Sequence, residues 1–425
     1  MEQFSLFGDI EIPHKQDKST TFTDNMRLPI HRWFKYSAGF SAEWVKNVIK
    51  EYGKNNSFIL DPFAGSGTTN VVANELGIHS LGYEQHYFVR QLANIKLFYD
   101  IDINVFNSII EEALTYPTVK MDISKEPELL QKCYTPDALV ELLTFRNFYF
   151  EKHKETPKWH LFWLVLTAIL RKTSHAGTAQ WQYVLPNKTK KNVITPKEAL
   201  KSKADEVISD IEISRQKNIK ELGTIIEHDA RIENPQIDNK VDLLITSPPY
   251  PNNYDYADAT RLEMVFWKEI SGWCDLYGKI RKNLVRSCSQ HSAADKIPLD
   301  NILSESELRP IHDELQVVCK ELEKVRLLHG GKKTYHTMIA SYYYDMARVF
   351  ISLRKAMKEE SVMCFVIGDS APYGVYAPAD IWLSKLAISA GFKSCKFEKT
   401  RDRNIKWKNR KHDVPLKEGR LWIKG

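Results

Sequence analysis

Several short runs of apolar residues occur along the chain, and many are continuously apolar rather than alternating with polar residues. This pattern is typical of strands buried on both faces of a parallel sheet. Residues 392–398 and 421–423 come after these runs and predict an antiparallel hairpin that closes the sheet. The other predicted strands cover residues 57–60, 79–84, 223–230, 241–246 and 362–367.

Segments between these strands carry apolar residues three to four positions apart, which predicts helices. Ser41 is a candidate N-cap for the first helix, and Gly77, Gly330 and Gly391 follow later helices as stop signals. Strands that alternate with helices in this way indicate an α/β fold with a mostly parallel sheet. The later predicted helices cover residues 68–76, 87–99, 139–150, 159–170, 308–328, 342–357 and 381–389.

Two segments interrupt the sheet pattern, and both are far longer than an ordinary connection between elements. Residues 101–222 are mostly helical in pattern, and residues 251–335 begin with a run of aromatic and amide side chains. We therefore expect an N-terminal arm and one sheet domain with two insertions. The arm covers residues 1–30, and the sheet domain combines residues 31–100, 223–250 and 336–425.

The composition is that of a globular chain with a large core, since 43% of its 425 residues are hydrophobic. A net charge of +6 permits a polyanionic partner such as nucleic acid. No run of about 18 apolar residues is present, so no membrane partner is expected. The six cysteines include no Cys-x-x-Cys pair, which favours reduced thiols in a cytoplasmic protein and argues against a metal site.

A glycine-rich turn, Asp61 to Thr69, connects the first two predicted strands. Its glycines allow the backbone to approach a ligand where a Cβ atom would clash. A phosphate-binding P-loop requires a lysine after the glycines, but Thr68 stands there. A dinucleotide fingerprint requires a third glycine, but Asn70 stands there. The turn therefore favours a nucleoside without phosphates, whose ribose Glu84 is placed to bind at the tip of the next strand.

A second motif, Ser247-Pro248-Pro249-Tyr250, follows the apolar strand at residues 241–246. Its two prolines forbid both strand and helix, so the backbone leaves the sheet in a fixed, extended shape. We expect the Ser247 hydroxyl and the Pro248 carbonyl to accept hydrogen bonds from an amino group while Tyr250 stacks on a flat ring. Alone, the motif is equally consistent with a rigid loop. The glycine-rich turn on the same sheet favours the chemical role.

Together the two motifs resemble those of the amino-methylating DNA methyltransferases, which use S-adenosylmethionine (SAM). The resemblance implies a Rossmann-like, mostly parallel sheet with an antiparallel C-terminal hairpin and two largely helical insertions. It implies that catalysis is carried by Ser247, Pro248, Pro249 and Tyr250. The cofactor-binding residues that it implies are Phe34, Tyr36, Asp61, Pro62, Phe63, Ala64, Gly65, Ser66, Gly67, Thr68, Thr69, Glu84 and Asp229.

The three acids in this set also have interpretations that do not involve the cofactor. Asp61 has a second interpretation as a cap of the glycine-rich turn, and Glu84 and Asp229 have one as surface acids. Methylation at carbon 5 of cytosine is not expected, because that family uses a Pro-Cys nucleophile and no cysteine here follows a proline.

The serine at the first catalytic position favours the exocyclic N4 amine of cytosine as methyl acceptor, because adenine N6 enzymes more often carry Asp or Asn there. Such an enzyme flips its target base out of duplex DNA. Adenine N6 is the alternative, followed by an RNA or protein amide methyltransferase and by a binding module without catalysis. A cognate restriction endonuclease acting separately would be a partner, and no metal is required.

Basic segments are the candidate DNA contacts, with solvated loops as the alternative interpretation. Residues 101–222 are the candidate target-recognition region, and residues 251–335 are a candidate DNA-contacting region. The basic residues expected to contact phosphates are Arg171, Lys172, Arg401, Arg403, Lys406, Lys408, Arg410 and Lys411.

Overall fold

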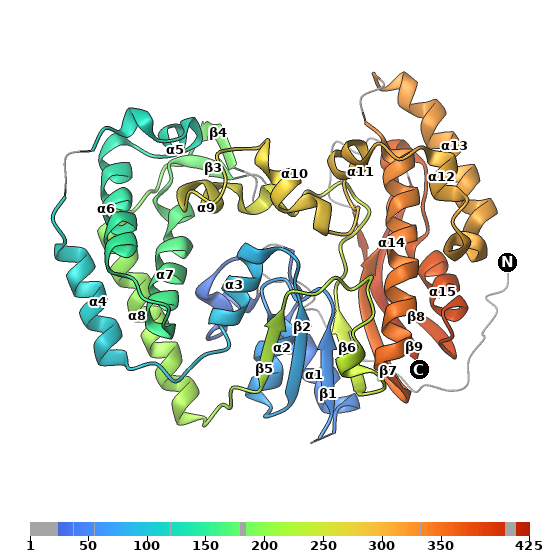
Figure 1. The fold of residues 1–425 in the computed structure, drawn as a ribbon, viewed down its shortest axis with the longest axis horizontal. Helices are drawn as coiled ribbons and strands as arrows, with labels where there is room; N and C mark the ends of the chain where they lie inside the picture. The colour runs from blue at the N-terminus through green and yellow to red at the C-terminus, as the bar shows by residue number, and fades with distance from the viewer. Residues whose placement is uncertain are drawn as a thin grey trace.

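A seven-stranded sheet forms the centre of the protein, with the strand order β5-β2-β1-β6-β7-β9-β8 (Figure 1). The computed structural model describes residues 24–36, 38–54, 56–118, 121–178, 184–330, 333–403 and 414–425. The strands are β1 (Phe58–Asp61), β2 (His79–Tyr83), β5 (Gly223–Ile226), β6 (Val241–Thr246), β7 (Met357–Gly368), β8 (Ser394–Arg403) and β9 (Leu416–Lys424). The first five in sheet order are parallel, and β9 is antiparallel to both of its neighbours. The predicted fold class, including the closing hairpin, is confirmed.

The strand order reverses next to β1, which lies between β2 and β6. Both neighbours are parallel to β1, with Leu60 opposite Leu81 on one side and opposite Leu244 on the other. In open parallel sheets, ligands bind outside the carboxyl ends of the strands at such a reversal. The glycine-rich turn follows β1 and the Ser-Pro-Pro-Tyr motif follows β6, so both motifs lie at this point.

Helices cover both faces of the sheet, as strands that are apolar on both faces require. On one face, α1 and α2 share a buried cluster with β1 and β6, and on the other α13, α14 and α15 pack together. The Ser41 side chain accepts a hydrogen bond from the Trp44 amide and caps α1, as predicted. The helices of the sheet domain and its flank are α1 (Ala42–Tyr52), α2 (Thr68–Glu75), α3 (Tyr87–Ile95), α13 (His312–Leu328), α14 (Tyr335–Ala356) and α15 (Ala379–Ser389).

The first insertion forms a helical lobe beside the sheet (Figure 1). Buried Asp210 ties this lobe to the sheet domain, because it accepts hydrogen bonds from the Ile30 amide, Arg32 and the Trp33 indole. A short hairpin follows α7 where the polar sequence predicted only a loop. The elements are α4 (Ile103–Thr115), α5 (Glu128–Cys133), α6 (Pro136–Lys152), α7 (Pro157–Thr173), β3 (Ala176–Thr178), β4 (Val184–Thr189) and α8 (Pro196–Gln216).

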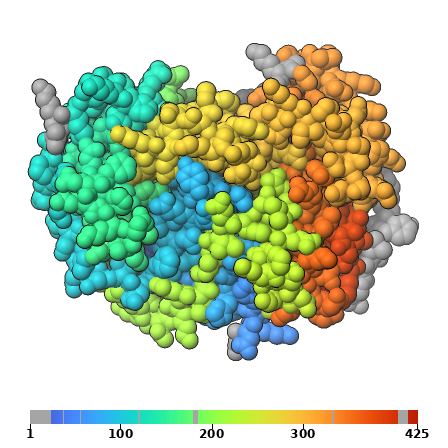
Figure 2. All heavy atoms as spheres, viewed as in Figure 1, coloured from blue at the N-terminus to red at the C-terminus, as the bar shows by residue number. Residues whose placement is uncertain are grey.

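The second insertion, yellow in Figure 2, forms a band from the helical lobe towards α13. Trp267 stacks on Trp163 of α7 with ring centroids 5.7 Å apart, and Arg146 of α6 donates a 2.8 Å hydrogen bond to the Phe266 carbonyl. The two insertions therefore pack against each other. Before α13, this insertion contains α9 (Arg261–Phe266), α10 (Asp275–Lys279), α11 (Ser289–Asp295) and α12 (Leu299–Leu303).

Several element boundaries differ from the prediction, including the end of β5 at Ile226 and the starts of β7 at Met357 and β9 at Leu416; those of α14 and β8 have clear physical reasons. Helix α14 begins at Tyr335 rather than near residue 342, because Met338, Ile339 and Ala340 are buried against the core. Strand β8 continues through charged residues to Arg403, because its backbone pairs with β9 even where its side chains face solvent. No helix in the described ranges is long and apolar enough to cross a membrane.

Candidate active site

A pocket with about 810 Å³ of empty space, part of it open to solvent, lies where β1, β2, β5 and β6 end. The carboxyl ends of parallel strands meet at one edge of the sheet, which explains why residues distant in sequence converge here. The cofactor turn and the catalytic motif therefore share one cavity. The residues predicted from the sequence that line it are Tyr36, Pro62, Phe63, Ala64, Gly65, Ser66, Thr68, Glu84, Asp229, Ser247 and Pro249.

The glycine-rich turn bends sharply at two glycines with left-handed backbone conformations. Gly65 has a φ of +52°, and a Cβ atom there would lie 3.2 Å from Tyr36 Cε1. Gly67 has a φ of +80° and is the N-cap residue of α2. For residues with a side chain, this backbone region costs about 1–2 kcal/mol. Both positions therefore strongly favour glycine.

Glu84 lies at the tip of β2 and holds the turn with its carboxylate. Its Oε2 accepts a 2.9 Å hydrogen bond from the Gly65 amide, and its Oε1 accepts a 2.8 Å bond from the His86 amide. Burial raises the pKa of Glu84 to about 7, although both hydrogen bonds act in the opposite direction. Each oxygen keeps a further lone pair, so the ionised carboxylate can also accept hydrogen bonds from a ligand.

The two ends of the glycine-rich turn are fastened to β6, the strand that carries the catalytic motif. Asp61 Oδ1 accepts a 2.6 Å hydrogen bond from the Thr246 hydroxyl, and the Thr69 hydroxyl donates to the Ile245 carbonyl at 3.2 Å. Burial raises the pKa of Asp61 to about 6. These contacts set the position of one motif relative to the other.

Four of the predicted cofactor residues do not line the pocket. Asp61 and Thr69 face β6 as described, and Asp61 also accepts a hydrogen bond from the Phe63 amide, which is the turn-capping arrangement. Phe34 belongs to the buried core cluster, and Gly67 begins α2. These four residues can therefore affect a bound cofactor only indirectly, by holding the lining residues in place.

The catalytic motif places Ser247 at the pocket, and a hydrogen bond to β7 fixes its hydroxyl. The hydroxyl donates a 3.4 Å hydrogen bond to the Val366 carbonyl of β7, which leaves the oxygen lone pairs able to accept from a ligand. The Tyr250 ring does not line the pocket and carries the Arg403 guanidinium 5.3 Å from its centroid. Burial raises the pKa of Tyr250, so its ring remains neutral.

The sequence did not indicate that the second insertion completes the pocket. Tyr256 and the segment Asn283–Leu284–Val285 line it, and His86 and His228 contribute to the wall beside the predicted acids. Of these, Tyr256 had a signal, because it belongs to the aromatic and amide run after the catalytic motif. Residues 283–285 carry no motif, and only the folding of the insertion brings them there.

Comparison with known proteins agrees with this geometry. Residues 5–94 match the N6/N4 methyltransferase family model, which is described as DNA methylase. The chain is 24% identical to Type II methyltransferase M.BsoBI of Geobacillus stearothermophilus, over 89% of this chain and 82% of that protein. It is 26% identical to Type II methyltransferase M.AvaI of Nostoc sp., over 88% and 81% of the two chains. The chain is therefore similar to the amino-methylating DNA methyltransferases, over residues 5–94 in the family model and over most of its length in these two relatives.

The residues around the pocket fit SAM, the methyl donor that the similarity to DNA methyltransferases implies. Ser66 and His86 line it, and their Oγ and Nδ1 atoms are buried without a hydrogen-bond partner among the described residues, which favours a polar ligand beside them. The rings of Tyr83 and His228, with centroids 4.4 Å apart and planes inclined by 53°, add an aromatic part of the wall beside Asp229.

The basic residues predicted to bind DNA occupy different environments. Arg171 bonds to buried Glu263 and to the Ala259 carbonyl, so its guanidinium joins α7 to the second insertion. Lys172 beside it is exposed, as a phosphate contact requires. Arg401 pairs with Glu418 at 2.6 Å, and Arg403 lies over the Tyr250 ring. Lys406, Lys408, Arg410 and Lys411 lie outside the described residues.

Proposed function

We propose that this DNA methyltransferase transfers the methyl group of SAM to the exocyclic N4 amine of cytosine in duplex DNA. The observation that carries the proposal is Ser247, the first residue of the catalytic motif, which lines the same pocket as Gly65 and Glu84. Adenine N6 enzymes more often carry Asp or Asn at this position. The wall residues Gly65, Ser66 and Glu84 are proposed to hold the cofactor.

The chemistry requires an amine to become a better nucleophile, because its lone pair is delocalised into the base. SAM supplies, when bound, a methyl group on a positively charged sulfur, which becomes a neutral thioether as the amine gains the methyl group and loses one proton. The Ser247 hydroxyl and the Pro248 carbonyl would accept hydrogen bonds from the amine and favour its pyramidal form. Tyr250 would stack on the flipped base. Holding amine and methyl in line supplies much of the acceleration.

The relatives support a restriction–modification context, since those with the longest alignments are named Type II methyltransferases. We propose that the enzyme marks a specific DNA sequence in the cytoplasm and that a cognate restriction endonuclease acts separately on unmethylated copies of that sequence. The two insertions are proposed to contact the DNA, with residues 101–222 as the target-recognition region.

The proposal is tested by expressing the protein in a host without DNA methylation and mapping modified bases by single-molecule sequencing. We expect N4-methylcytosine at one short recognition sequence, and its absence in a Ser247→Ala strain. N6-methyladenine at a defined sequence would contradict the choice of cytosine while keeping the DNA substrate. Methyl transfer onto RNA or protein, with unmodified DNA, would contradict the DNA substrate as well.

Cofactor affinity is expected to depend on pH through Glu84. Ribose hydroxyls donate to the ionised carboxylate, and the pKa of Glu84 in the free protein is about 7. The ionised fraction therefore rises with pH, and SAM should bind more tightly at pH 8 than at pH 6, by up to about tenfold per pH unit below the pKa. Titration calorimetry at several pH values measures this, and a Glu84→Gln variant should lose the dependence. An equal slope in both proteins would exclude Glu84 as its source.

A further inference from the structure

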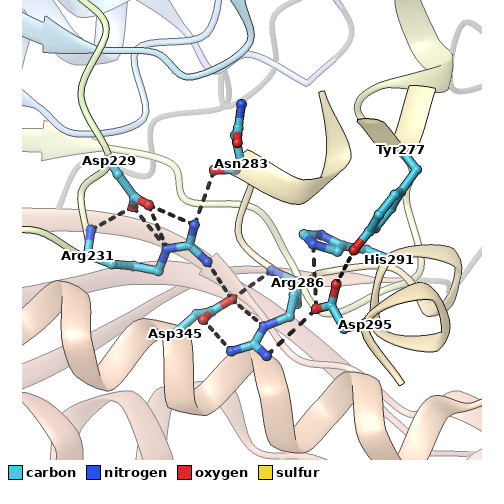
Figure 3. Close-up of polar contacts among 8 residues, drawn as sticks. All are labelled: Asp229, Arg231, Tyr277, Asn283, Arg286, His291, Asp295 and Asp345. Carbon is cyan, nitrogen blue, oxygen red and sulfur yellow. Dashed lines mark hydrogen bonds and ion pairs between the residues drawn. The ribbon is translucent and has the colours of Figure 1, made fainter. Parts of the chain in front are cut away.

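One guanidinium group contacts both the sheet-domain wall of the cofactor pocket and the wall that belongs to the second insertion. Arg231 Nε donates to Asp229 Oδ1 at 2.9 Å, and its Nη2 donates to Asp229 Oδ2 at 2.8 Å and to the Asn283 carbonyl at 3.2 Å (Figure 3). Asp229 and Asn283 both line the pocket, although they come from different segments of the chain. Arg231 therefore joins the wall of the sheet domain to the wall of the insertion.

The same guanidinium is anchored from behind by a buried carboxylate. Arg231 Nη1 lies 3.3 Å from Oδ2 of Asp345, which is on α14 and fully buried. Asp345 also pairs with Arg286 at 2.6 Å and accepts a 3.0 Å hydrogen bond from the Arg286 amide. Figure 3 shows the resulting chain of alternating charges, which continues from Arg286 to Asp295 at 3.8 Å. Both ends of the insertion segment 283–295 are thus attached to this series of ion pairs.

We propose that Arg231 is a positioning residue of the cofactor site, which orients Asp229 and places the Asn283–Val285 wall against the cofactor at the same time. The inference rests on the proposed function, because it takes SAM as the ligand of this pocket. A planar guanidinium offers several N–H donors in a fixed fork and can serve three partners at once, whereas a lysine ammonium is a flexible point charge. The two walls consequently move as one unit, and cofactor binding is coupled to the placement of the insertion.

The coupling is reciprocal, as linkage requires. If the Asn283–Val285 wall closes on the cofactor, then bound cofactor also stabilises residues 283–295 in their folded position. This segment contains α11 and belongs to the insertion proposed to contact DNA. The cofactor therefore prepares part of the DNA-contacting region before the substrate arrives.

The test compares SAM binding and kinetics of the wild-type protein with Arg231→Lys and Arg231→Met. We expect the SAM dissociation constant to rise by about tenfold or more in both variants, within the usual range of coupling between sites. The KM for SAM should increase more than kcat decreases, which loss of folded protein alone would not produce. In the double variant Asp229→Asn/Arg231→Met, the SAM dissociation constant should rise by a smaller factor than the product of the two single-variant factors, because the residues act together.

A second measurement follows the insertion directly. Hydrogen exchange of residues 283–295 should slow when SAM is added to the wild-type protein, and this protection should be lost in Arg231→Lys. If Arg231→Met does not fold, Arg231→Lys decides the question with the same two measurements.

A matched control is available in the helical lobe. Arg146 is buried, pairs with Glu126 at 2.6 Å and donates to the Phe266 carbonyl, but neither of these partners lines the pocket. Arg146→Met should lower the unfolding temperature and leave the SAM dissociation constant of the folded protein unchanged. Wild-type affinity in the Arg231 variants would overturn the inference alone, whereas a wild-type protein that does not bind SAM would overturn the proposed function with it.

Discussion

Replacing Ser247 with alanine is expected to lower the rate of methyl transfer by about 100-fold to 1,000-fold, the usual effect of removing one preorganised polar group from a reaction centre. The hydroxyl is held by the Val366 carbonyl at 3.4 Å and faces the pocket with its lone pairs. Without it, the amine loses an acceptor for one of its protons. Single-turnover transfer of radioactive methyl groups to DNA measures the effect, and SAM binding should persist.

The folded state should hardly change in this variant, because a single long hydrogen bond contributes about 1 kcal/mol or less. Ser384→Ala is the matched control. Its hydroxyl also donates to a backbone carbonyl, that of Asp380 at 2.6 Å, but on α15 and outside the pocket. The control should keep full activity. A Ser247→Ala enzyme with normal transfer rates would exclude the hydroxyl from the chemistry.

Replacing Gly65 with alanine is expected to weaken SAM binding by at least about tenfold, which corresponds to 1.4 kcal/mol. The backbone at this position has a φ of +52°, and the new methyl group would lie 3.2 Å from the Tyr36 ring inside the pocket wall. The turn must shift, and its amide would move away from Glu84. Titration calorimetry gives the affinity, and thermal unfolding should show a loss of stability of about 1–2 kcal/mol.

Gly77→Ala separates backbone strain from the loss of the site. Gly77 ends α2 with a φ of +68°, and a Cβ atom there would have no neighbour within 4 Å. The two variants should lose similar stability, but Gly77→Ala should bind SAM as the wild-type protein does. Equal loss of affinity in both would mean that general destabilisation, rather than the shape of the turn, controls cofactor binding.

Much of the sheet domain was predictable because its signals are local. Apolar runs marked β1, β6 and β7, and an apolar helix that ends in glycine marked α2. The hairpin β3–β4 was missed because its strands are short and their side chains do not alternate: Ala176 is buried, residues 184–186 are half-buried and residues 187–189 are exposed. Arg171 illustrates a second limit, since a basic residue after an apolar helix has the same local sequence whether it faces a phosphate or a buried glutamate.

The sequence alone determined the two motifs, their order and their places at strand ends, because each depends on residues that are neighbours in the chain. Tertiary structure alone decided what completes the pocket. Asn283 to Val285 have no recognisable pattern, yet Arg231 and Asp345 hold them beside Asp229. A buried guanidinium takes its partners from whichever segments fold around it. Such long-range contacts leave no periodicity in the sequence, and only the folded chain brings them together.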